Sequence, residues 1–427
     1  MKIYVKTLGC RLNQAESERI AQGFVLAGHE VETHEEDADL IVLNTCTVTR
    51  EAARKSVHAA RRRPGQKLVV TGCHSEVAPE TFAGADLIVA SGQKENLVAL
   101  AAQRLGTEGF ALGADYREDG ALHLYPLVLD NTRAFVKIQD GCNLSCSFCL
   151  TTIARGDARS RPLGEIVVEV RRLAGRGCQE IVLTGVHAGS YGREIAGMAD
   201  LGALVDRILE ETSIRRLRLS SLEPWNFEPE WLDLWPRWGD RLCRHLHMSL
   251  QSGADSVLQR MRRAYRTDTF ADKVAAARAV IPNVAITTDI IVGFPGETEE
   301  EHRESLAYVE EIGFANAHIF TFSPRPGTRA ATMPGQVPNR IKKCRYHEMR
   351  AVTERTAHDY RVVMQGTVQP VLWEQAREDG THSGLTDTYL PVHSRDPRAR
   401  RNRISHVRLG RLEGESFEVE WGVGSGE

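Results

Sequence analysis

The chain has 427 residues and a formal net charge of −3. A chain of this length is expected to form two or three domains, which excludes a miniprotein held together by disulfides. No apolar run approaches the roughly 18 residues of a membrane span, and the start of the chain lacks the apolar core of a signal peptide. We therefore expect a soluble cytoplasmic protein that does not bind membranes. The near-neutral charge predicts that any nucleic acid is held by local basic patches.

Residues 1–105 alternate short apolar runs with amphipathic stretches, a pattern that predicts an open parallel α/β sheet. Three of the runs end in a cysteine, at Cys10, Cys46 and Cys73. Ligands of an open parallel sheet gather at the carboxyl ends of its strands, so the three thiols are expected to share one crevice. The alternative is three buried structural cysteines.

Residues 106–133 show no regular pattern and are interpreted as a connector. Residues 134–365 then contain strand candidates separated by helices, and end in a polar helix over roughly 340–365. Six such units are too many for a small sheet and too few for a closed eight-unit barrel, so we predict a partial (β/α)6 barrel. The candidate strands are Ala134–Ile138, Glu180–Leu183, Arg216–Ser220, His245–Leu250, Ala285–Val292 and His318–Phe322.

Residues 366–427 carry short strand candidates without helices between them, which predicts a small all-β barrel. The candidate strands are Val368–Trp373, Tyr389–His393, Ser405–Leu409 and Phe417–Trp421. An arginine cluster lies between two of them and is typical of phosphate binding. We predict RNA contacts at Arg398, Arg400, Arg401 and Arg403.

Cys142, Cys146 and Cys149 follow the first strand of the central series directly, with C-x3-C-x2-C spacing. Iron–sulfur clusters are usually held by four thiolates, so three thiolates leave one iron free to take a small molecule. Structural zinc is the competing interpretation. It is disfavoured because such sites use four ligands, and no fourth cysteine or histidine lies near the triplet in the sequence.

The triplet resembles the signature of the radical S-adenosylmethionine (SAM) superfamily. The segments Thr7–Asn13, Asn44–Thr49 and Thr71–Cys73 resemble the cysteine motifs of its methylthiotransferase family. The resemblance covers nearly the whole chain, and the last 62 residues or so resemble the RNA-binding TRAM domain, an OB-like barrel. One departure is Leu150-Thr151-Thr152, where the family commonly has two isoleucines and a proline. Further matching segments are Arg155–Pro162, Ile181–His187, Leu219–Pro224, Leu250–Gly253, Asp289–Glu297 and Phe322–Thr328.

The resemblance implies an enzyme with two 4Fe-4S clusters and SAM. Cys142, Cys146 and Cys149 would hold the cluster that cleaves SAM to a 5′-deoxyadenosyl radical, the species needed to break an unactivated adenine C2–H bond. A second cluster would carry the sulfur and be held by Cys10, Cys46 and Cys73. The implied partners are tRNA and an electron donor such as flavodoxin or ferredoxin.

Within the family, the motifs around Cys10 and Cys46 look most like the branch that methylthiolates N6-threonylcarbamoyladenosine in tRNA. The alternatives are the isopentenyladenosine branch and the branch that modifies a ribosomal-protein aspartate. That last branch commonly has proline after the first cysteine, where this chain has Arg11. An RNA-binding protein with a structural metal and a two-cluster electron-transfer protein are disfavoured, because both are expected to have fully ligated metal sites.

Strand ends that would face the first cluster supply candidate SAM contacts, although each could equally cap a loop. Arg155, Arg159 and Arg161 follow the triplet closely and could meet either RNA or the carboxylate of the cofactor. The candidate SAM contacts are Gly185, Glu223, Gln251, Ser252 and Asp289.

Overall fold

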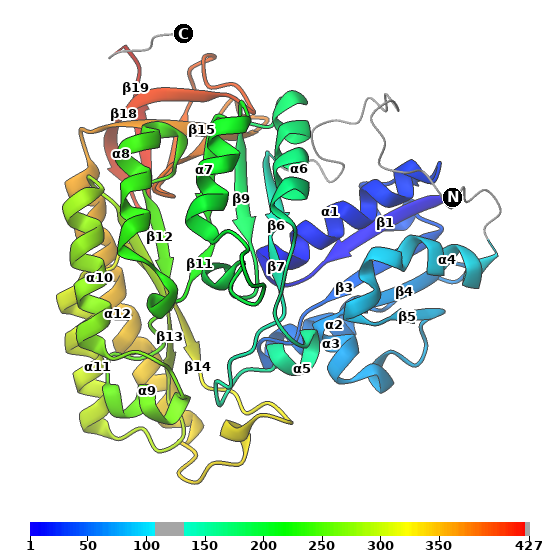
Figure 1. Ribbon diagram of the computed structural model, residues 1–427, viewed down its shortest axis with the longest axis horizontal. Helices are drawn as coiled ribbons and strands as arrows, with labels where there is room; N and C mark the ends of the chain where they lie inside the picture. The colour runs from blue at the N-terminus through cyan, green and yellow to red at the C-terminus, as the bar shows by residue number, and fades with distance from the viewer. Residues whose placement is uncertain (107–131, 423–427) are drawn as a thin grey trace.

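The computed structural model describes residues 1–106 and 132–422, which form three successive parts of the chain (Figure 1). The predicted connector, residues 106–133, lies almost entirely outside the described residues. Its last residue, Arg133, already begins a strand of the central part. Within the described residues, no helix combines the length and the apolar character needed to cross a bilayer.

The N-terminal part is an open, fully parallel five-stranded sheet, as predicted, with the strand order β2-β1-β3-β4-β5. Its middle strand is buried along its whole length because helices cover both faces, and its first four residues, Leu40–Leu43, form a continuous apolar run. The strands are β1 (Lys2–Thr7), β2 (Glu30–Val31), β3 (Leu40–Thr45), β4 (Lys67–Gly72) and β5 (Leu87–Val89). The helices are α1 (Arg11–Leu26), α2 (Arg50–Ala59), α3 (Cys73–Val77) and α4 (Leu97–Leu105).

The central part confirms the predicted partial barrel. Its parallel strands follow one another in chain order, and β14 does not pair back to β6, so the barrel stays open on one side. Two short strands on either side of Ser220 form one interrupted strand, which makes six in all. The strands are β6 (Arg133–Lys137), β9 (Glu180–Thr184), β10 (Arg216–Leu219), β11 (Ser221–Leu222), β12 (His245–Met248), β13 (Ala285–Val292) and β14 (Asn316–Thr321).

Helices cover the outside of these strands, and their apolar faces join the strands in the largest core of the molecule. A capping box at Thr298 and Glu301 starts α11, as its sequence indicates. The helices are α6 (Leu163–Gly175), α7 (Leu201–Glu211), α8 (Leu234–Trp238), α9 (Asp255–Met261), α10 (Thr267–Val280), α11 (Glu299–Ile312) and the trailing α12 (Asn339–Met364).

The C-terminal part is a closed barrel of five strands around Trp373 and Phe417. The sequence indicated four of them and missed β16, in which Leu385 is the only large apolar residue. The strand is built around Gly384, where a Cβ would lie 2.5 Å from the Leu372 carbonyl oxygen. The strands are β15 (Val368–Ala376), β16 (His382–Thr386), β17 (Pro391–Ser394), β18 (Ile404–Glu413) and β19 (Ser416–Glu420).

A buried ion cluster joins this barrel to the amino ends of the central strands. Glu180 accepts from Arg218 at 2.8 Å, and Arg216 also pairs with this carboxylate. Both arginines reach beyond it into the C-terminal barrel, where Arg216 donates to the Pro370 carbonyl at 3.1 Å and Arg218 to the Asp387 carbonyl at 2.6 Å. The C-terminal barrel therefore sits at the end of the central strands opposite to the Cys142 loop (Figure 1).

We predict that acid weakens this junction. Burial alone would raise the pKa of Glu180, but the guanidinium groups of Arg216 and Arg218 outweigh burial and lower it to about 2. Because the pKa of Glu180 is lower in the folded protein than in the unfolded chain, its carboxylate stabilises the folded state at pH values above the pKa of the unfolded chain. This contribution, about 3 kcal/mol, is lost as pH falls through the folded value. Thermal unfolding followed from neutral pH to about pH 2.5 measures the loss.

The Glu180→Gln variant should be less stable at neutral pH by about 3 kcal/mol, because it leaves buried arginines without their anion. It should also lose this part of the acid dependence. Glu210→Gln, on the exposed side of α7, is the matched control and should keep the parent behaviour. If thermal stability falls by the same amount between neutral pH and about pH 2.5 in Glu180→Gln and in the parent, this role of Glu180 is refuted.

Candidate active site

The cysteine triplet lies on a loop between β7 (Gln139–Asp140) and α5 (Thr151–Arg155), at the carboxyl end of β6. Gly141 leads into the loop with φ 68°, and a Cβ there would lie 1.9 Å from the Asp157 carbonyl oxygen. The Cys142 N–H donates to the Gly156 carbonyl at 3.0 Å. Glycine permits this close approach, so the loop folds back against the segment after α5. All three thiols are free and half-buried.

Backbone N–H groups point at two of these sulfurs. Leu144 donates to Cys142 Sγ at 3.5 Å, and Thr151 donates to Cys149 Sγ at 3.3 Å. Donors of this kind favour the thiolate and tune iron–sulfur clusters. Burial raises the pKa of the Cys142 thiol to about 11, so cluster binding must release its proton.

Arg263 and His187 contact the triplet. Arg263 lies in no sequence motif, and His187 ends the matching segment Ile181–His187 without having been predicted to act at this site. Arg263 donates to Cys146 Sγ at 3.5 Å and to Glu223 Oε2 at 2.9 Å. His187 Nε2 lies 2.9 Å from the Asn226 amide nitrogen, a donor, so the neutral ring carries its proton on Nδ1. That Nδ1 lies 3.9 Å from Cys142 Sγ. Burial lowers the pKa of His187, which keeps the ring neutral near pH 7.

Two of the predicted SAM contacts border the triplet. Glu223 follows β11 and reaches the cysteines through its ion pair with Arg263. Gly185 follows β9, and a Cβ there would lie 3.1 Å from Gln139 side-chain atoms, so the missing side chain lets the two strand ends pack closely.

The other three predicted SAM contacts differ in their surroundings. Gln251 has φ 69°, and its backbone forms a parallel bridge opposite Ile290 of β13: its N–H donates to the Asp289 carbonyl and its carbonyl accepts the Ile291 N–H, each at 2.8 Å. Ser252 is buried, and its hydroxyl accepts the Ala254 N–H at 3.3 Å, which is a loop-capping contact. Asp289 lies within β13, short of its end, and pairs with His247 at 3.3 Å.

The N-terminal cysteines come from neighbouring strand ends. Cys10 follows β1 and precedes α1, Cys46 follows β3, and Cys73 follows β4 and begins α3. Gly9 has φ 100°, and a Cβ there would lie 2.6 Å from Cys46 Sγ. Gly72 has φ 104°, and a Cβ there would lie 2.4 Å from the Thr45 carbonyl oxygen. These glycines let the three turns approach one another, and the structure thus brings the three cysteines to one edge of the sheet.

The two cysteine groups meet at the boundary between the N-terminal and central parts. Arg155, at the end of α5, donates to Cys73 Sγ at 3.2 Å. Arg325, in the loop after β14, donates to Thr47 Oγ1 at 2.6 Å, next to Cys46. Segments of the central barrel therefore contact the edge of the N-terminal sheet that carries Cys10, Cys46 and Cys73.

Within residues 1–106 and 132–422, no three His, Cys, Asp or Glu side chains converge tightly enough to hold a single metal ion. A cubane cluster binds each cysteine through a separate iron and therefore accepts wider spacing. Two sets of three free thiols, with N–H donors directed at Cys142, Cys149 and Cys73, fit clusters of that kind.

Comparisons with known proteins match both cysteine groups to family models. Residues 136–309 match the radical SAM superfamily, and residues 2–90 match an uncharacterized protein family, UPF0004. A Bacillus subtilis (strain 168) protein named "Threonylcarbamoyladenosine tRNA methylthiotransferase MtaB" is 36% identical over 403 residues, covering 90% of this chain and 88% of its own. The chain belongs to the radical SAM methylthiotransferase family. Such a methylthiotransferase is an enzyme that uses SAM and a 4Fe-4S cluster.

Another methylthiotransferase relative carries a different substrate in its name. The "tRNA-2-methylthio-N(6)-dimethylallyladenosine synthase" of Akkermansia muciniphila is 34% identical over 425 residues, covering 92% of each chain. Among solved structures, the radical SAM methyltransferase TsrM of Kitasatospora setae aligns with a TM-score of 0.57 at 18% identity, covering 77% of this chain and 76% of that one. The likeness to TsrM supports only the fold of this chain.

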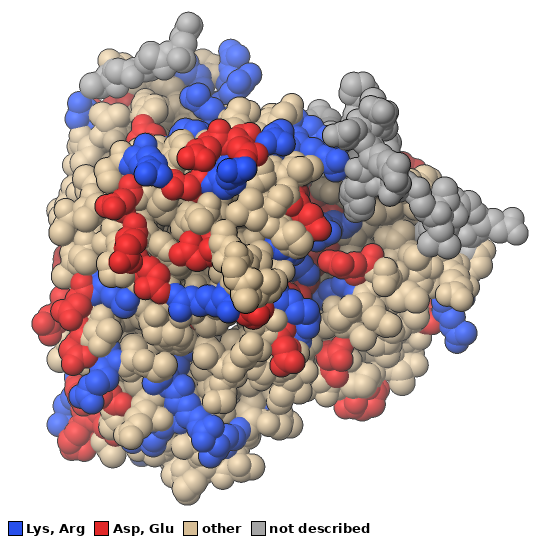
Figure 2. Space-filling view, in the orientation of Figure 1, with Lys and Arg blue, Asp and Glu red and all other residues tan. Residues whose placement is uncertain are grey.

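The predicted RNA-binding arginines of this methylthiotransferase lie on the loop between β17 and β18 of the C-terminal barrel, which is consistent with a TRAM domain. Arg398, Arg400, Arg401 and Arg403 are all exposed. Arg398 pairs with Asp396 at 2.7 Å, while Arg401 donates to the Glu374 carbonyl at 3.1 Å. On the face shown in Figure 2, basic and acidic side chains are interspersed over the central part, so no uniformly basic surface covers this face.

Proposed function

We propose that the protein is the tRNA N6-threonylcarbamoyladenosine C2-methylthiotransferase and acts in the cytoplasm. In this proposal Cys142, Cys146 and Cys149 hold the cluster that binds SAM, and a second cluster is held by the N-terminal cysteines, Cys10, Cys46 and Cys73. A flavodoxin or ferredoxin supplies the electron. When bound, the two clusters and SAM supply the radical and the methylated sulfur that no side chain can provide.

The residues around the triplet would prepare the site for this chemistry. The Leu144 and Thr151 N–H groups, together with His187, would donate to the Sγ atoms of the cluster ligands Cys142 and Cys149. Arg263 and Glu223 form a partly buried ion pair that orients both side chains beside Cys146. We assign SAM binding to the carboxyl ends of the central strands, beside the triplet. The candidate contacts are Gly185, Glu223, Gln251, Ser252 and Asp289.

The observation that carries the choice of substrate is an arginine beside the polar interior of the barrel that, within the described residues, pairs with no carboxylate. His245 and His247 alternate along β12 with the core residues Leu246 and Met248, so the two histidines face inward. The ring of His247 lies 6.1 Å from that of His318, which is exposed on β14.

Arg11 lies beside this interior. Its guanidinium is 5.1 Å from the centre of the Tyr389 ring. Burial, and to a smaller extent the charge of Arg11, lowers the pKa of His245 and of His318. Within the described parts of the chain, Arg11 forms no ion pair with a carboxylate. A threonylcarbamoyl group carries a carboxylate and a dimethylallyl group is apolar, so an unpaired arginine favours the first. The name of the Bacillus subtilis relative agrees with this preference.

We predict that Arg11→Gln reduces kcat/KM for tRNA bearing threonylcarbamoyladenosine about ten- to a hundredfold, the worth of one charge-assisted hydrogen bond. Reaction with tRNA bearing dimethylallyladenosine, if any, should stay unchanged. Arg19→Gln, further along α1, is the matched control. Preferred turnover of the dimethylallyl substrate by the parent enzyme, or equal losses on both substrates in Arg11→Gln, would contradict the substrate assignment.

Two basic regions support tRNA as the partner. One is the exposed loop of the C-terminal barrel that carries Arg400 and Arg403. The other is a pocket of about 1000 Å³ at the end of β14, whose lining among the described residues includes the cations Arg50, Lys342 and Lys343 and no carboxylate. Cations gathered without anions suit a phosphate backbone.

The double variant Arg400→Gln/Arg403→Gln should bind tRNA more weakly. When a phosphate contact is lost, tRNA binding releases fewer counterions. The slope of log K against log salt should therefore become less steep by about 0.7–0.9 per lost contact. Titrations at several salt concentrations measure this slope. Arg398→Gln should change it less, since Arg398 already pairs with Asp396. A double variant with the affinity and salt slope of the parent would remove this loop from the tRNA interface.

A further inference from the structure

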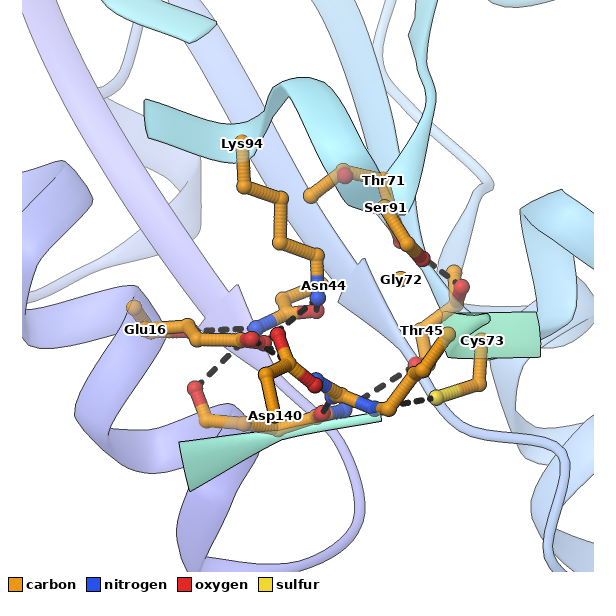
Figure 3. A network of polar contacts seen from close by, with 12 residues as sticks. Glu16, Asn44, Thr45, Thr71, Gly72, Cys73, Ser91, Lys94 and Asp140 are labelled. Atoms are coloured by element: carbon orange, nitrogen blue, oxygen red, sulfur yellow. Dashed lines mark hydrogen bonds and ion pairs between the residues drawn. The ribbon is translucent and has the colours of Figure 1, made fainter. Parts of the chain in front are cut away.

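Arg155 belongs to the central part of the chain, yet its side chain is buried among residues of the N-terminal part. Its Nε–H donates to Cys73 Sγ at 3.2 Å. One terminal nitrogen donates to Glu16 at 2.8 Å and to Asp140 at 2.9 Å, and the other donates to Asn13 at 2.7 Å and to Glu16 at 3.2 Å. Figure 3 shows Glu16, Asp140 and Cys73 in this network.

These contacts decide what Arg155 can bind. A guanidinium has five N–H donors, and the five contacts above use all of them. The side chain is only 3% exposed. No donor therefore remains for an RNA phosphate or for the carboxylate of SAM, and the sulfur of Cys73 is the one acceptor in the set that belongs to a proposed cluster.

The charge of the network also calls for an anion. Glu16 pairs with Lys94 at 2.5 Å and with Lys137 at 3.5 Å, and Lys137 also contacts Asp140 at 3.3 Å. Within the described residues, Lys94, Lys137 and Arg155 thus share the two carboxylates of Glu16 and Asp140. Because a buried excess charge is costly, the network favours a negative group beside it. A doubly positive cubane bound by three thiolates is such a group, with one net negative charge.

We propose that Arg155 is a positioning residue of the second cluster, which fixes the Cys73 sulfur and raises the reduction potential of that cluster. The proposal rests on the proposed function, in which Cys73 is a cluster ligand. Reduction adds negative charge to the cluster and its sulfurs, and a hydrogen bond from a cation strengthens as its acceptor becomes more negative. The bond therefore stabilises the reduced state more than the oxidised state.

The test isolates the second cluster. In a full-length parent with Cys142, Cys146 and Cys149 all changed to alanine, the remaining iron and the EPR signal of the reduced protein report on the N-terminal site alone. Arg155→Lys keeps the positive charge near Glu16 but removes the planar fork that reaches Cys73. We expect the iron content of the parent and a midpoint potential shifted to more negative values. Arg171→Gln, which loses an exposed ion pair with Glu211, should show no shift.

A second measurement uses the same triple-alanine parent without a further substitution, because Arg263, which donates to Cys146 Sγ at 3.5 Å, could otherwise give an arginine coupling at the first cluster. Pulsed EPR on parent protein labelled with 15N-arginine should show a weak nitrogen coupling to the reduced cluster, since one arginine nitrogen lies 3.2 Å from Cys73 Sγ. An unshifted potential in iron-loaded Arg155→Lys, or no arginine coupling in the loaded parent, would overturn the role of Arg155 alone. A parent that binds no iron would instead refute the second cluster, and this inference with it.

Discussion

Replacing Cys142 by alanine is expected to abolish both 5′-deoxyadenosine formation and methylthiolation of tRNA. In our proposal one iron of the first cluster must stay free for SAM, and the other three irons depend on the three thiolates of the triplet. With two thiolates left, iron bound per chain should fall by about half. Anaerobic reactions followed by chromatography, with iron analysis of the same samples, measure both effects.

Cys344→Ser is the matched control for this variant. Cys344 lies exposed on α12 and belongs to neither cysteine group, so its replacement should leave iron content and both products unchanged. If Cys142→Ala retained SAM cleavage at the parent rate, the assignment of the triplet to the radical chemistry would be wrong.

Replacing Cys73 by alanine is expected to separate the two activities. The triplet and its N–H donors remain, so 5′-deoxyadenosine should still form, while the methylthio product disappears because the sulfur-bearing cluster loses a ligand. The variant also removes the acceptor of Arg155, whose remaining contacts with Glu16 and Asp140 keep it paired. The ratio of methylthiolated nucleoside to 5′-deoxyadenosine in a single reaction mixture measures this effect, so no comparison between enzyme preparations is needed.

Cys178→Ala is the control, because Cys178 is buried in the central part of the chain and contacts the Glu180 carbonyl rather than either group. Its replacement should cost some stability and leave the ratio of products unchanged. Methylthiolated nucleoside formed by Cys73→Ala would show that the second site does not carry the sulfur.

Most of the architecture could be predicted because the patterns are local. Apolar runs such as Leu40–Leu43 and the capping box at Thr298 signal parallel strands and helices directly, and the number of units limited the central part to a partial barrel. The strand β16 was missed because its position depends on Gly384 packing against β15, which is a tertiary contact. No periodicity within five mostly small or polar residues reveals such a contact.

In the candidate site, too, some residues could be predicted from the sequence and others could not. The cysteines are identified by spacing and by their places at strand ends, which are local features. Arg263 stands in an ordinary basic stretch, and its contact with Cys146 depends on how α9 packs. Arg155 could be singled out, but its role could not, because its acceptors Asn13 and Glu16 come from a distant part of the chain. Burial and pairing of charges are decided by the assembled fold.

The most direct test of the account is mass spectrometry of the nucleosides from tRNA incubated anaerobically with the reconstituted enzyme, a reductant and SAM. We predict a 2-methylthio-N6-threonylcarbamoyladenosine peak that is absent when either Cys142 or Cys73 is replaced by alanine. SAM cleavage without this nucleoside would contradict the proposed substrate, and an enzyme that binds no iron after reconstitution would contradict the account as a whole.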